Sequence, residues 1–275
     1  MLGKGRALVD KVDIVMWTKN SSKLLPLVLK RIDEVIPSEV AGKKIIIDDH
    51  STDNTVEIAK KMGWNVYENP GHGIFDAFET ALKLVSSEFF ISIEHDILLS
   101  KDWWKKISRY MKDDKVAVAQ GVRASTNPFL KKFDEYIIER TDEKSKNLTI
   151  TIDNNLYRTS VIRRFGINVH DHAHARAVLE EKGFKWIIDR SLVSGHIRPS
   201  MRYFIEHDYQ MHKNYIGSLN RRPELLKNFK LFLFSPFRGL HIALKKKCPQ
   251  ILIFYTLDRW AILRAYLEWK PKTKS

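Results

Sequence analysis

Two apolar runs in this 275-residue chain end in pairs of carboxylates. An isoleucine run leads into Asp48 and Asp49, and a second apolar run farther along leads into Glu94 and Asp96. A buried strand that ends in this way delivers its acidic side chains to the carboxyl edge of a sheet, where open α/β folds bind their ligands. Oxygen ligands of this kind suit a hard divalent cation. Four carboxylates at one edge therefore predict a site for a metal-bound diphosphate.

Strands and helices are predicted to alternate around these carboxylates. The expected strands are 12–17, 44–47, 64–67, 89–93, 116–119, 149–153 and 185–188, and the expected helices are 24–36, 55–62, 74–85, 102–111, one near Ser160, and 173–182. Such alternation requires a mostly parallel sheet with helices on both faces. Asn54 and Glu57 are spaced as a capping pair for the second helix. Residues 121–147 are expected to form an acceptor-side loop or a helical insertion.

The positive charge is concentrated near the carboxyl terminus. The whole chain carries +14, but residues 221–275 hold thirteen Lys or Arg against three Asp or Glu. Cations there are interleaved with aromatic and aliphatic residues, which is typical of amphipathic helices on an anionic membrane surface. The alternative is a basic helical cap whose cations are simply solvated. We expect a catalytic domain over 1–215 and a basic helical extension over 216–275.

Composition excludes several classes of protein. The single cysteine, Cys248, rules out an internal disulfide and a cysteine-rich zinc site. No uncharged apolar run reaches the length of a membrane span, and the first residues lack the apolar core of a signal peptide, so residence in the cytoplasm is expected. Nucleic acid is not an expected partner, because the chain contains no recognised nucleic-acid motif.

Four motifs occur in an order that resembles family 2 of the glycosyltransferases. They are the strand at 12–16, the block at 48–53, the segment Asn69-Pro70-Gly71, and Glu94-His95-Asp96. The family pattern is a hydrophobic strand, a DDGSTD-like turn, an N-x-G segment and a D-x-D metal motif. The resemblance implies a GT-A fold, which is a Rossmann-like α/β architecture, followed here by the amphipathic helical extension.

The resemblance also implies roles for the acidic residues. Thr18, Asp48 and Asp49 correspond to positions that hold the base and ribose of a nucleotide-sugar donor, with a helix or turn cap as the alternative role for Asp49. Asp96 matches the last Asp of D-x-D and is the expected ligand of Mg²⁺ or Mn²⁺. Glu94 replaces the first Asp with a longer side chain, and it is assigned to the nucleotide.

Basic residues are available for the diphosphate and the acceptor. His72 precedes a helix whose backbone N–H groups could face phosphate. Arg158 and Arg198 are candidates for binding a diphosphate or an acceptor anion, with a plain surface role as the alternative for Arg158. His196 follows the last predicted strand and is either a metal ligand or a turn residue.

The family's catalytic base lies in an acidic pair a short distance before a glycine. Counting back from Gly183 places Asp171 on the first position of that pair and His172 on the second. A shift of one residue would make Asp171 the base itself, and either group can accept a proton from a hydroxyl near neutral pH. The alternative is a helix start with incidental imidazole side chains.

Together these features predict an inverting, metal-dependent glycosyltransferase that acts peripherally at the cytoplasmic face of a membrane. The expected partners are a nucleotide-sugar donor, an anionic membrane surface and a lipid-linked acceptor, for example a polyprenyl phosphate such as dolichyl phosphate. One alternative is a soluble transferase that glycosylates a polysaccharide or protein hydroxyl. Another is an inactive relative that serves as a binding subunit, since Glu94 and His172 depart from the family pattern.

Overall fold

The protein is described from a computed structural model, which covers residues 11–140, 150–166, 172–198, 200–219 and 225–269. Backbone contacts divide the chain into two compact units. The first unit comprises residues 1–123 and 141–196, and the second comprises residues 124–140 and 197–275. The second unit thus begins earlier than the predicted extension at 216, and it also includes a segment from the middle of the chain.

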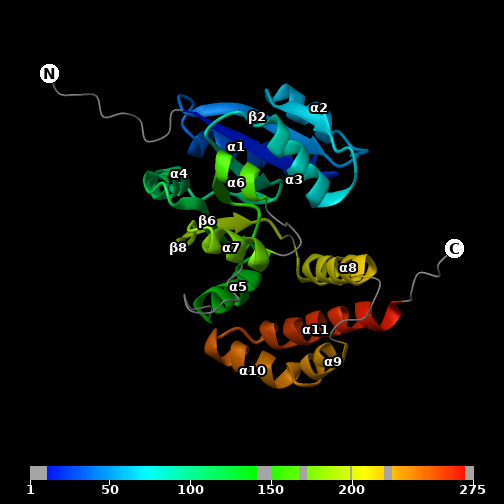
Figure 1. The fold of residues 1–275 in the computed structure, drawn as a ribbon. Helices are drawn as coiled ribbons and strands as arrows, with labels where there is room; N and C mark the ends of the chain where they lie inside the picture. Colours follow the sequence, from blue (N-terminus) through cyan, green and yellow to red (C-terminus); the bar gives the residue numbers. More distant parts are fainter. Residues whose placement is uncertain (1–10, 141–149, 167–171, 199, 220–224, 270–275) are drawn as a thin grey trace. The chain divides into compact units, whose positions relative to one another are not determined.

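Within the described residues, the strands form a single eight-stranded sheet in the order β3-β2-β1-β4-β7-β6-β8-β5. Figure 1 labels β2, β6 and β8 among them. The strands are β1 Val12–Thr18, β2 Ala41–Asp48, β3 Asn65–Glu68, β4 Phe89–Glu94, β5 Ile97–Leu98, β6 Val116–Ser125, β7 Asn155–Arg158 and β8 Lys185–His196. Strands β3, β2, β1 and β4 are parallel neighbours. Antiparallel pairs join β4 to β7, β7 to β6, and β5 to β8. The predicted α/β fold class is confirmed.

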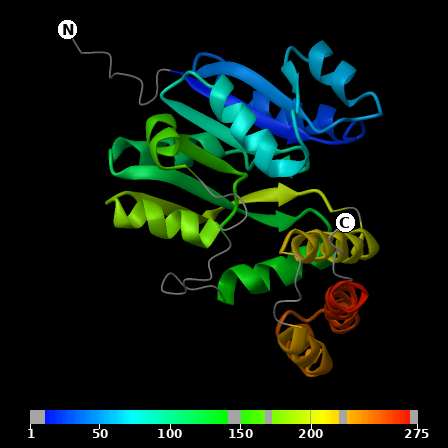
Figure 2. The same ribbon diagram turned by 45° about the vertical axis from the view of Figure 1, so that its right-hand side comes forward.

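Helices cover both faces of this sheet (Figure 2). They are α1 Leu25–Val35, α2 Thr55–Lys61, α3 Gly73–Leu84, α4 Trp103–Ile107, the 3₁₀ helix Ser108–Lys112, α6 Thr159–Phe165 and α7 His172–Glu181. The predicted capping pair before α2 is wrong, because Asn54 makes no side-chain capping bond. Asp53 takes that role instead, since its Oδ1 accepts from the backbone N–H of Thr55 at 3.0 Å.

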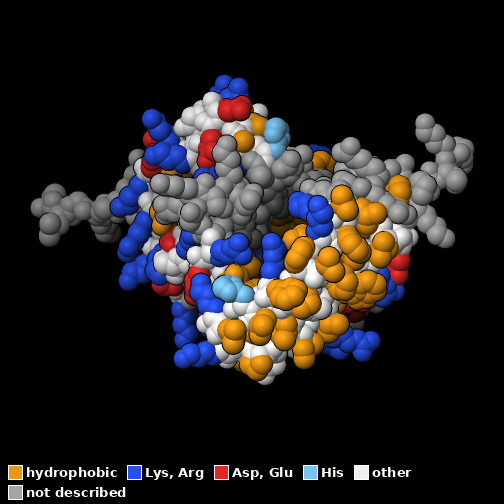
Figure 3. Space-filling model, turned by 90° about the horizontal axis from the view of Figure 1, so that it is seen from below, with side chains coloured by type: hydrophobic (Ala, Val, Ile, Leu, Met, Phe, Trp, Pro, Cys, Tyr) orange, Lys and Arg blue, Asp and Glu red, His pale blue; other side chains and the backbone are white. Residues whose placement is uncertain are grey.

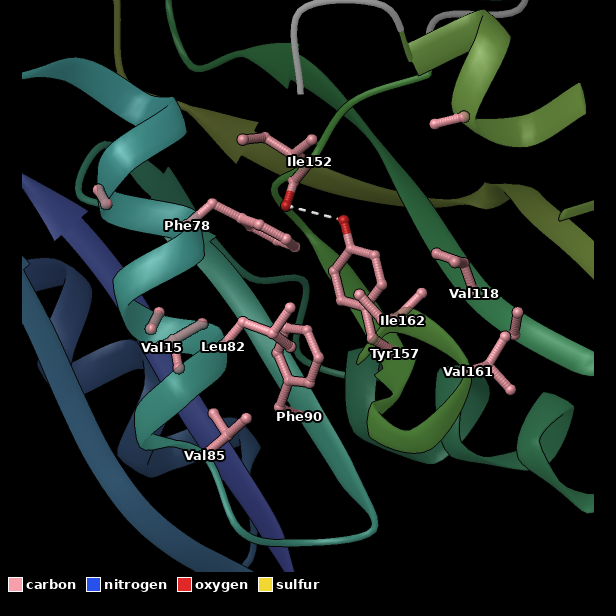
Figure 4. Packing of buried hydrophobic residues seen from close by; sticks show 14 of the residues in the cluster. Val15, Phe78, Leu82, Val85, Phe90, Val118, Ile152, Tyr157, Val161 and Ile162 are labelled. Carbon is pink, nitrogen blue, oxygen red and sulfur yellow. Dashed lines mark hydrogen bonds between the residues drawn. The ribbon is translucent and has the colours of Figure 1, made fainter. Parts of the chain in front are cut away.

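Aromatic packing holds α3 against the middle of the sheet (Figure 4). Phe78 of α3 lies 6.2 Å from the ring of Phe90 on β4 and 6.1 Å from that of Tyr157 on β7. Phe90 and Tyr157 stack on each other at 4.8 Å, and all three side chains are buried. The Tyr157 hydroxyl donates to the carbonyl of Ile152 at 3.1 Å. This core therefore fixes the segment that leads into β7 as well as the strands.

One prediction about the middle of the chain needs correction, and another is narrowed to one of its alternatives. Ile150 to Asn154 form no strand, because Thr151 Oγ1 and Asn155 Nδ2 bond to backbone carbonyls within the segment and fold it into turns. Thr149 lies outside the described residues. For residues 121–147 the alternative of a helical insertion is confirmed in the described part, since the end of β6 is followed by a regular helix, α5 Pro128–Arg140.

The second unit is built from helices around the buried ring of Phe254. It contains α5, α8 Met201–Leu219, α9 Leu225–Leu233, α10 Ser235–Lys245 and α11 Gln250–Glu268. Phe254 of α11 meets Phe133 of α5 at 5.2 Å and Phe204 of α8 at 5.1 Å, edge to face in both cases. None of the described helices is long and apolar enough to cross a membrane.

Candidate active site

Strand register brings the predicted nucleotide-binding residues to one edge of the sheet. Thr18 is the register partner of Asp48, and Trp17 is the partner of Glu94 on the other side of β1. The Thr18 hydroxyl donates to Asp48 Oδ1 at 3.2 Å, and the backbone N–H of Ser51 donates to Asp48 Oδ2 at 2.8 Å. Asp48 is therefore a buried carboxylate that is held in a fixed orientation at the carboxyl ends of parallel strands.

Asp49 receives three hydrogen bonds from different segments. Lys19 Nζ, Asn69 Nδ2 and the backbone N–H of Gly73 each lie 2.9 Å from its carboxylate oxygens. Burial acts to raise the pKa of Asp49, but these bonds outweigh it and hold the pKa below its ordinary value. Because Gly73 is the first residue of α3, Asp49 anchors the start of that helix in addition to any role in ligand binding.

His72 lies beside Asp49 on the exposed surface of the first unit. Its Nδ1 is 3.9 Å from Asp49 Oδ1, and its ring is 4.7 Å from the ring of His50. One ligand atom from each of these three residues falls within 4.8 Å of the others, so the cluster could hold a metal ion. The sequence did not predict this cluster. Both oxygens of Asp49 are already engaged, by Lys19 and Asn69, which makes them weaker candidates for a cation than Asp96 Oδ1, which has no hydrogen-bond partner among the described residues.

Asp96 and His196, the two predicted metal ligands, are brought together by the β5–β8 pair. Ile97 follows Asp96 and is the register partner of His196, and His196 Nε2 lies 2.9 Å from Asp96 Oδ2. Burial acts to raise the pKa of Asp96, but the bond and charge of His196 lower it to about 2. Asp96 Oδ1 is buried and has no hydrogen-bond partner among the described residues. An ionised carboxylate with an unsatisfied oxygen next to an imidazole fits Mn²⁺ or Mg²⁺.

Arg123 of β6 adds a cation that was not predicted as part of the core of the site. Its Nη1 donates to Glu94 Oε2 at 3.1 Å and to Asp153 Oδ2 at 2.9 Å. Trp17 Nε1 donates to the other oxygen of Glu94 at 3.4 Å. Burial raises the pKa of Asp153 to about 6, although the positive charge of Arg123 opposes that rise. Arg123 therefore offsets the negative charge that Glu94, Asp96 and Asp153 would otherwise gather in one place.

The sequence contains one indirect signal for this arrangement. A Cβ atom at Gly121 would lie 2.8 Å from Asn154 Nδ2 and 3.0 Å from the carbonyl oxygen of Leu192. Only glycine lets β6 approach both segments without a shift. Gly121 thus permits the close packing that sets Arg123 opposite Asp153.

Arg158 has a structural role at the opposite edge of the sheet, contrary to the prediction that it meets a diphosphate or acceptor. It is the register partner of Phe89, the first residue of β4, whereas Glu94 is the last. Its guanidinium is buried and donates to the carbonyls of Val116 at 3.2 Å and Met111 at 3.1 Å. Because β7 runs antiparallel to β4, Arg158 lies beside the start of β4, at the end of the strand away from Glu94.

Three predicted residues remain, namely Asp171, His172 and Arg198. Asp171 is outside the described residues, and His172 begins α7 without a described side chain. Arg198 belongs to the second unit, where its Nη1 lies 3.3 Å from Asp134 and its guanidinium stacks 4.1 Å from the ring centre of Phe204. The roles of these three residues stay predictions.

Solved structures with a similar fold include several glycosyltransferases. The mannosyltransferase PcManGT from Pyrobaculum calidifontis, in complex with GDP-Man and Mn²⁺, is 17% identical with a TM-score of 0.58, over 94% of this chain and 76% of that one. Glucosyl-3-phosphoglycerate synthase from Mycobacterium tuberculosis, in complex with Mn²⁺, UDP and glucosyl-3-phosphoglycerate, is 12% identical with a TM-score of 0.54, over 70% and 74%. TarS 1–349 from S. aureus, in complex with UDP-GlcNAc, is 14% identical with a TM-score of 0.53, over 94% and 92%. At these identities the likeness shows the GT-A fold.

The sequence itself also matches known proteins. An uncharacterized glycosyltransferase of Rickettsia conorii is 31% identical over 97 residues, which are 35% of this chain and 33% of that protein. The match thus spans about a third of the length of that curated relative. The family model for glycosyl transferase family 2 matches residues 13–185, which is more than half of the chain. The chain therefore belongs to glycosyl transferase family 2.

Proposed function

We propose that this protein is a metal-dependent, inverting glycosyltransferase that moves a sugar from a nucleotide-sugar to a lipid-linked acceptor at the cytoplasmic face of a membrane. The observation that carries the proposal is the buried Asp96–His196 pair, in which Asp96 follows the strand that delivers Glu94 and His196 ends β8. This pair offers a divalent cation one oxygen and one nitrogen ligand. Three solved structures of similar fold contain a nucleotide or a nucleotide-sugar, and two of these contain Mn²⁺.

The donor's nucleoside is assigned to the ends of β1, β2 and β4. Asp48 and Asp49 are both fixed by donors from the protein, so their remaining lone pairs can accept from base and ribose groups without rearrangement. Glu94 is held between Trp17 and Arg123, which orients its carboxylate. The hydrogen bonds that lower the pKa of Asp49 also keep it ionised, and an ionised carboxylate is the stronger acceptor.

The donor's diphosphate is assigned to the Asp96–His196 pair. These two residues would hold Mg²⁺ or Mn²⁺, and the bound ion would supply positive charge for the departing nucleoside diphosphate. Arg123 has a different task, because both of its described partners are carboxylates of the protein. Its positive charge balances the negative charges of Glu94 and Asp153, so the metal ion does not have to balance them as well.

The acceptor is assigned to the side of Asp171 and His172, either of which would remove a proton from a hydroxyl acceptor. A lipid phosphate would need less help from a base, since the second pKa of a phosphate monoester is about 6. The basic and apolar helices α9 and α10 favour a lipid-linked acceptor over a soluble one. A single displacement with inversion is the course that the family resemblance implies.

A thermal-shift screen tests the donor part of this proposal. The full-length chain is heated with GDP, UDP, CDP or ADP, with and without Mn²⁺. One nucleoside diphosphate should raise the melting temperature only when Mn²⁺ is present, because the ion would supply the positive charge that the diphosphate needs. A ligand at 100 times its Kd stabilises the folded state by about 2.7 kcal/mol, which is a measurable shift. If no diphosphate raises the melting temperature under either condition, the chain is a partner-binding relative and the proposal fails.

A transfer assay tests the acceptor part. The donor sugar identified by that screen is supplied in labelled form, together with polyprenyl phosphate in vesicles or with soluble hydroxyl acceptors. Label is expected in the lipid phase, where it should resist washing with aqueous buffer. Transfer to the hydroxyl acceptors alone would replace the lipid-linked acceptor by a soluble one, without affecting the donor assignment.

A further inference from the structure

Helices α9 and α10 enclose an open groove that combines cations with apolar side chains. The groove has a volume of about 550 Å³. Its lining residues are Leu226, Lys227, Lys230, Leu231, Phe234 and Arg238. Half of these residues are cationic and half are apolar, and none is acidic. A ligand that matches this lining carries negative charge next to a hydrocarbon group.

The groove opens among exposed apolar side chains that form a stripe on each helix. On α9 the stripe comprises Leu226, Phe229 and Leu233, and on α10 it comprises Phe237, Leu240 and Leu244. Both sets follow the i, i+3, i+7 spacing of one helical face. Phe237 and Leu244 are 72% and 71% exposed, which is unusual for side chains of this size in a packed protein. Figure 3 shows hydrophobic side chains gathered on one face of the molecule with Lys and Arg beside them.

The charge around this face has one sign. Residues 225–257 contain six Lys or Arg and no Asp or Glu. Two of these cations have partners in the same unit, since Lys246 Nζ lies 2.6 Å from Glu139 and Lys245 Nζ lies 5.3 Å from the ring centre of Tyr136. The lysine run at 245–247 is therefore partly engaged by α5. The cations of the groove line it together with Leu226, Leu231 and Phe234.

We propose that the face formed by α9 and α10 docks on an anionic membrane, with the phosphate of one lipid headgroup held in the groove by Lys227, Lys230 and Arg238. The apolar stripes would enter the boundary between headgroups and acyl chains, where exposed Leu and Phe side chains leave water. This surface deepens the proposed function, and rests on it, because it names the residues that would bring the enzyme to a lipid-linked acceptor. A protein partner is disfavoured, because a groove with three cations would then need a matching acidic and apolar segment.

Vesicle sedimentation of the full-length chain tests the charged part of the surface. The variant K227Q/K230Q/R238Q is compared with K101Q/K105Q/K112Q, which removes the same charge from exposed lysines of the first unit. On vesicles containing phosphatidylglycerol, the groove variant should lose on the order of 100-fold in binding, about 3 kcal/mol, because each cation near an anionic surface contributes about 1 kcal/mol. The control variant should bind within a few-fold of the parent protein.

A second variant tests the apolar part. Phe237→Ser should weaken binding to the same vesicles by roughly tenfold, since it removes most of one buried aromatic side chain from the interface. Leu27→Ser, at an exposed position on α1, is the matched control and should have no effect. Because both side chains are exposed, neither change should lower the melting temperature of the protein appreciably.

The other possible occupants of this face give different results. Inorganic phosphate at millimolar concentration should not displace the protein from vesicles; if it does, the groove binds free phosphate and the membrane proposal is wrong. A concentration-dependent dimer that Phe237→Ser abolishes would show that a second copy covers the face, and would also overturn the proposal. Equal binding of the parent protein and the groove variant to anionic vesicles would also overturn the proposal.

These outcomes can be separated from a failure of the proposed function. Binding of a nucleoside diphosphate with Mn²⁺ involves the first unit, and the groove variant should retain it in full. Retained diphosphate binding without vesicle binding would refute only the membrane surface. Vesicle binding without any diphosphate binding would refute only the glycosyltransferase assignment.

Discussion

The guanidinium of Arg123 donates to the carboxylate of Asp153 at 2.9 Å, and the same nitrogen lies 3.1 Å from Glu94. This contact links β6, the end of β4 and the segment that precedes β7. Asp153 is almost completely buried, and its raised pKa shows that burial is only partly compensated by the charge of Arg123. Disruption of this buried ion pair should therefore destabilise the folded state strongly, because removal of one partner leaves a buried charge uncompensated.

Arg123→Gln should lower the free energy of unfolding by about 3 kcal/mol, since Glu94 and Asp153 would lose their shared cation. Urea denaturation measures this loss, with Arg109→Gln as the control at an exposed position. Adding Asp153→Asn to the Arg123 variant should recover part of the stability, because the buried charge is then removed as well. A loss below about 1 kcal/mol for Arg123→Gln would place the pair among weak surface bridges and contradict this account.

Asp96→Asn should abolish the Mn²⁺-dependent stabilisation by nucleoside diphosphate. The amide keeps the size of the side chain but removes the charge and one of the oxygen ligands that a divalent cation requires. Thermal shift and direct Mn²⁺ titration by calorimetry both measure the effect. Asp102→Asn, on the same unit, is the control and should behave like the parent protein.

The exposed cluster near Asp49 provides a contrast for that experiment. His50→Ala and His72→Ala should leave Mn²⁺ binding within a few-fold of the parent value if Asp96 holds the ion. If these two changes abolish Mn²⁺ binding and Asp96→Asn does not, the cation belongs to the Asp49–His50–His72 cluster instead.

Asp258→Asn should stabilise the protein at neutral pH. Asp258 is buried on α11 beside Arg259, and burial raises its pKa from 3.8 to about 6. Asp208 of α8 adds to the rise, while Arg259 opposes it. Between pH 3.8 and pH 6 the folded state therefore holds a proton that the unfolded state has released, and stability falls as the pH rises through this window.

Above pH 6 Asp258 is fully ionised in the folded state, and its destabilising effect is complete. The increase in the free energy of unfolding caused by Asp258→Asn should therefore be largest above pH 6 and should vanish below pH 4. An estimate of about 3 kcal/mol follows from 1.36 kcal/mol per pKa unit over the rise from 3.8 to about 6, which already includes the attraction to Arg259. Urea denaturation of parent and variant at pH 4, 5, 6 and 7.5 measures the difference. A variant that is less stable than the parent at pH 7.5 would show that the pair with Arg259 outweighs the cost of burial.

Asp171→Asn and His172→Ala should distinguish the two kinds of acceptor. With a hydroxyl acceptor, loss of the true base should reduce transfer by roughly 10²–10⁴. With polyprenyl phosphate the loss should be modest, because the attacking oxygen is already largely ionised, and Arg198→Ala should then lower transfer more than either change. A 10⁴-fold loss of transfer in Asp171→Asn, with normal transfer by Arg198→Ala, would establish a hydroxyl acceptor.

Arg158→Ala should reduce the stability of the protein, since the Arg158 guanidinium donates hydrogen bonds to backbone carbonyls.

The residues at the ends of the parallel strands could be predicted from the sequence. An apolar run that stops at a carboxylate is a local pattern, and parallel strands meet at one edge, so Thr18, Asp48 and Glu94 follow from the order of the elements. Asp96 was assigned by its match to a family motif. Its contact with His196, one hundred residues away, depends on the pairing of β5 with β8.

Only the tertiary structure placed Arg123 opposite Asp153, moved Arg158 to the far edge and joined α5 to the carboxyl-terminal helices. The first two outcomes depend on β7, Asn155–Arg158, which the sequence did not predict as a strand and which runs antiparallel to β4 and β6. Reversing a strand exchanges the residues at its two ends. The third depends on packing between Phe133 and Phe254, which are far apart in the chain. Local patterns specify which residues end a strand, whereas long-range packing decides which strand ends meet.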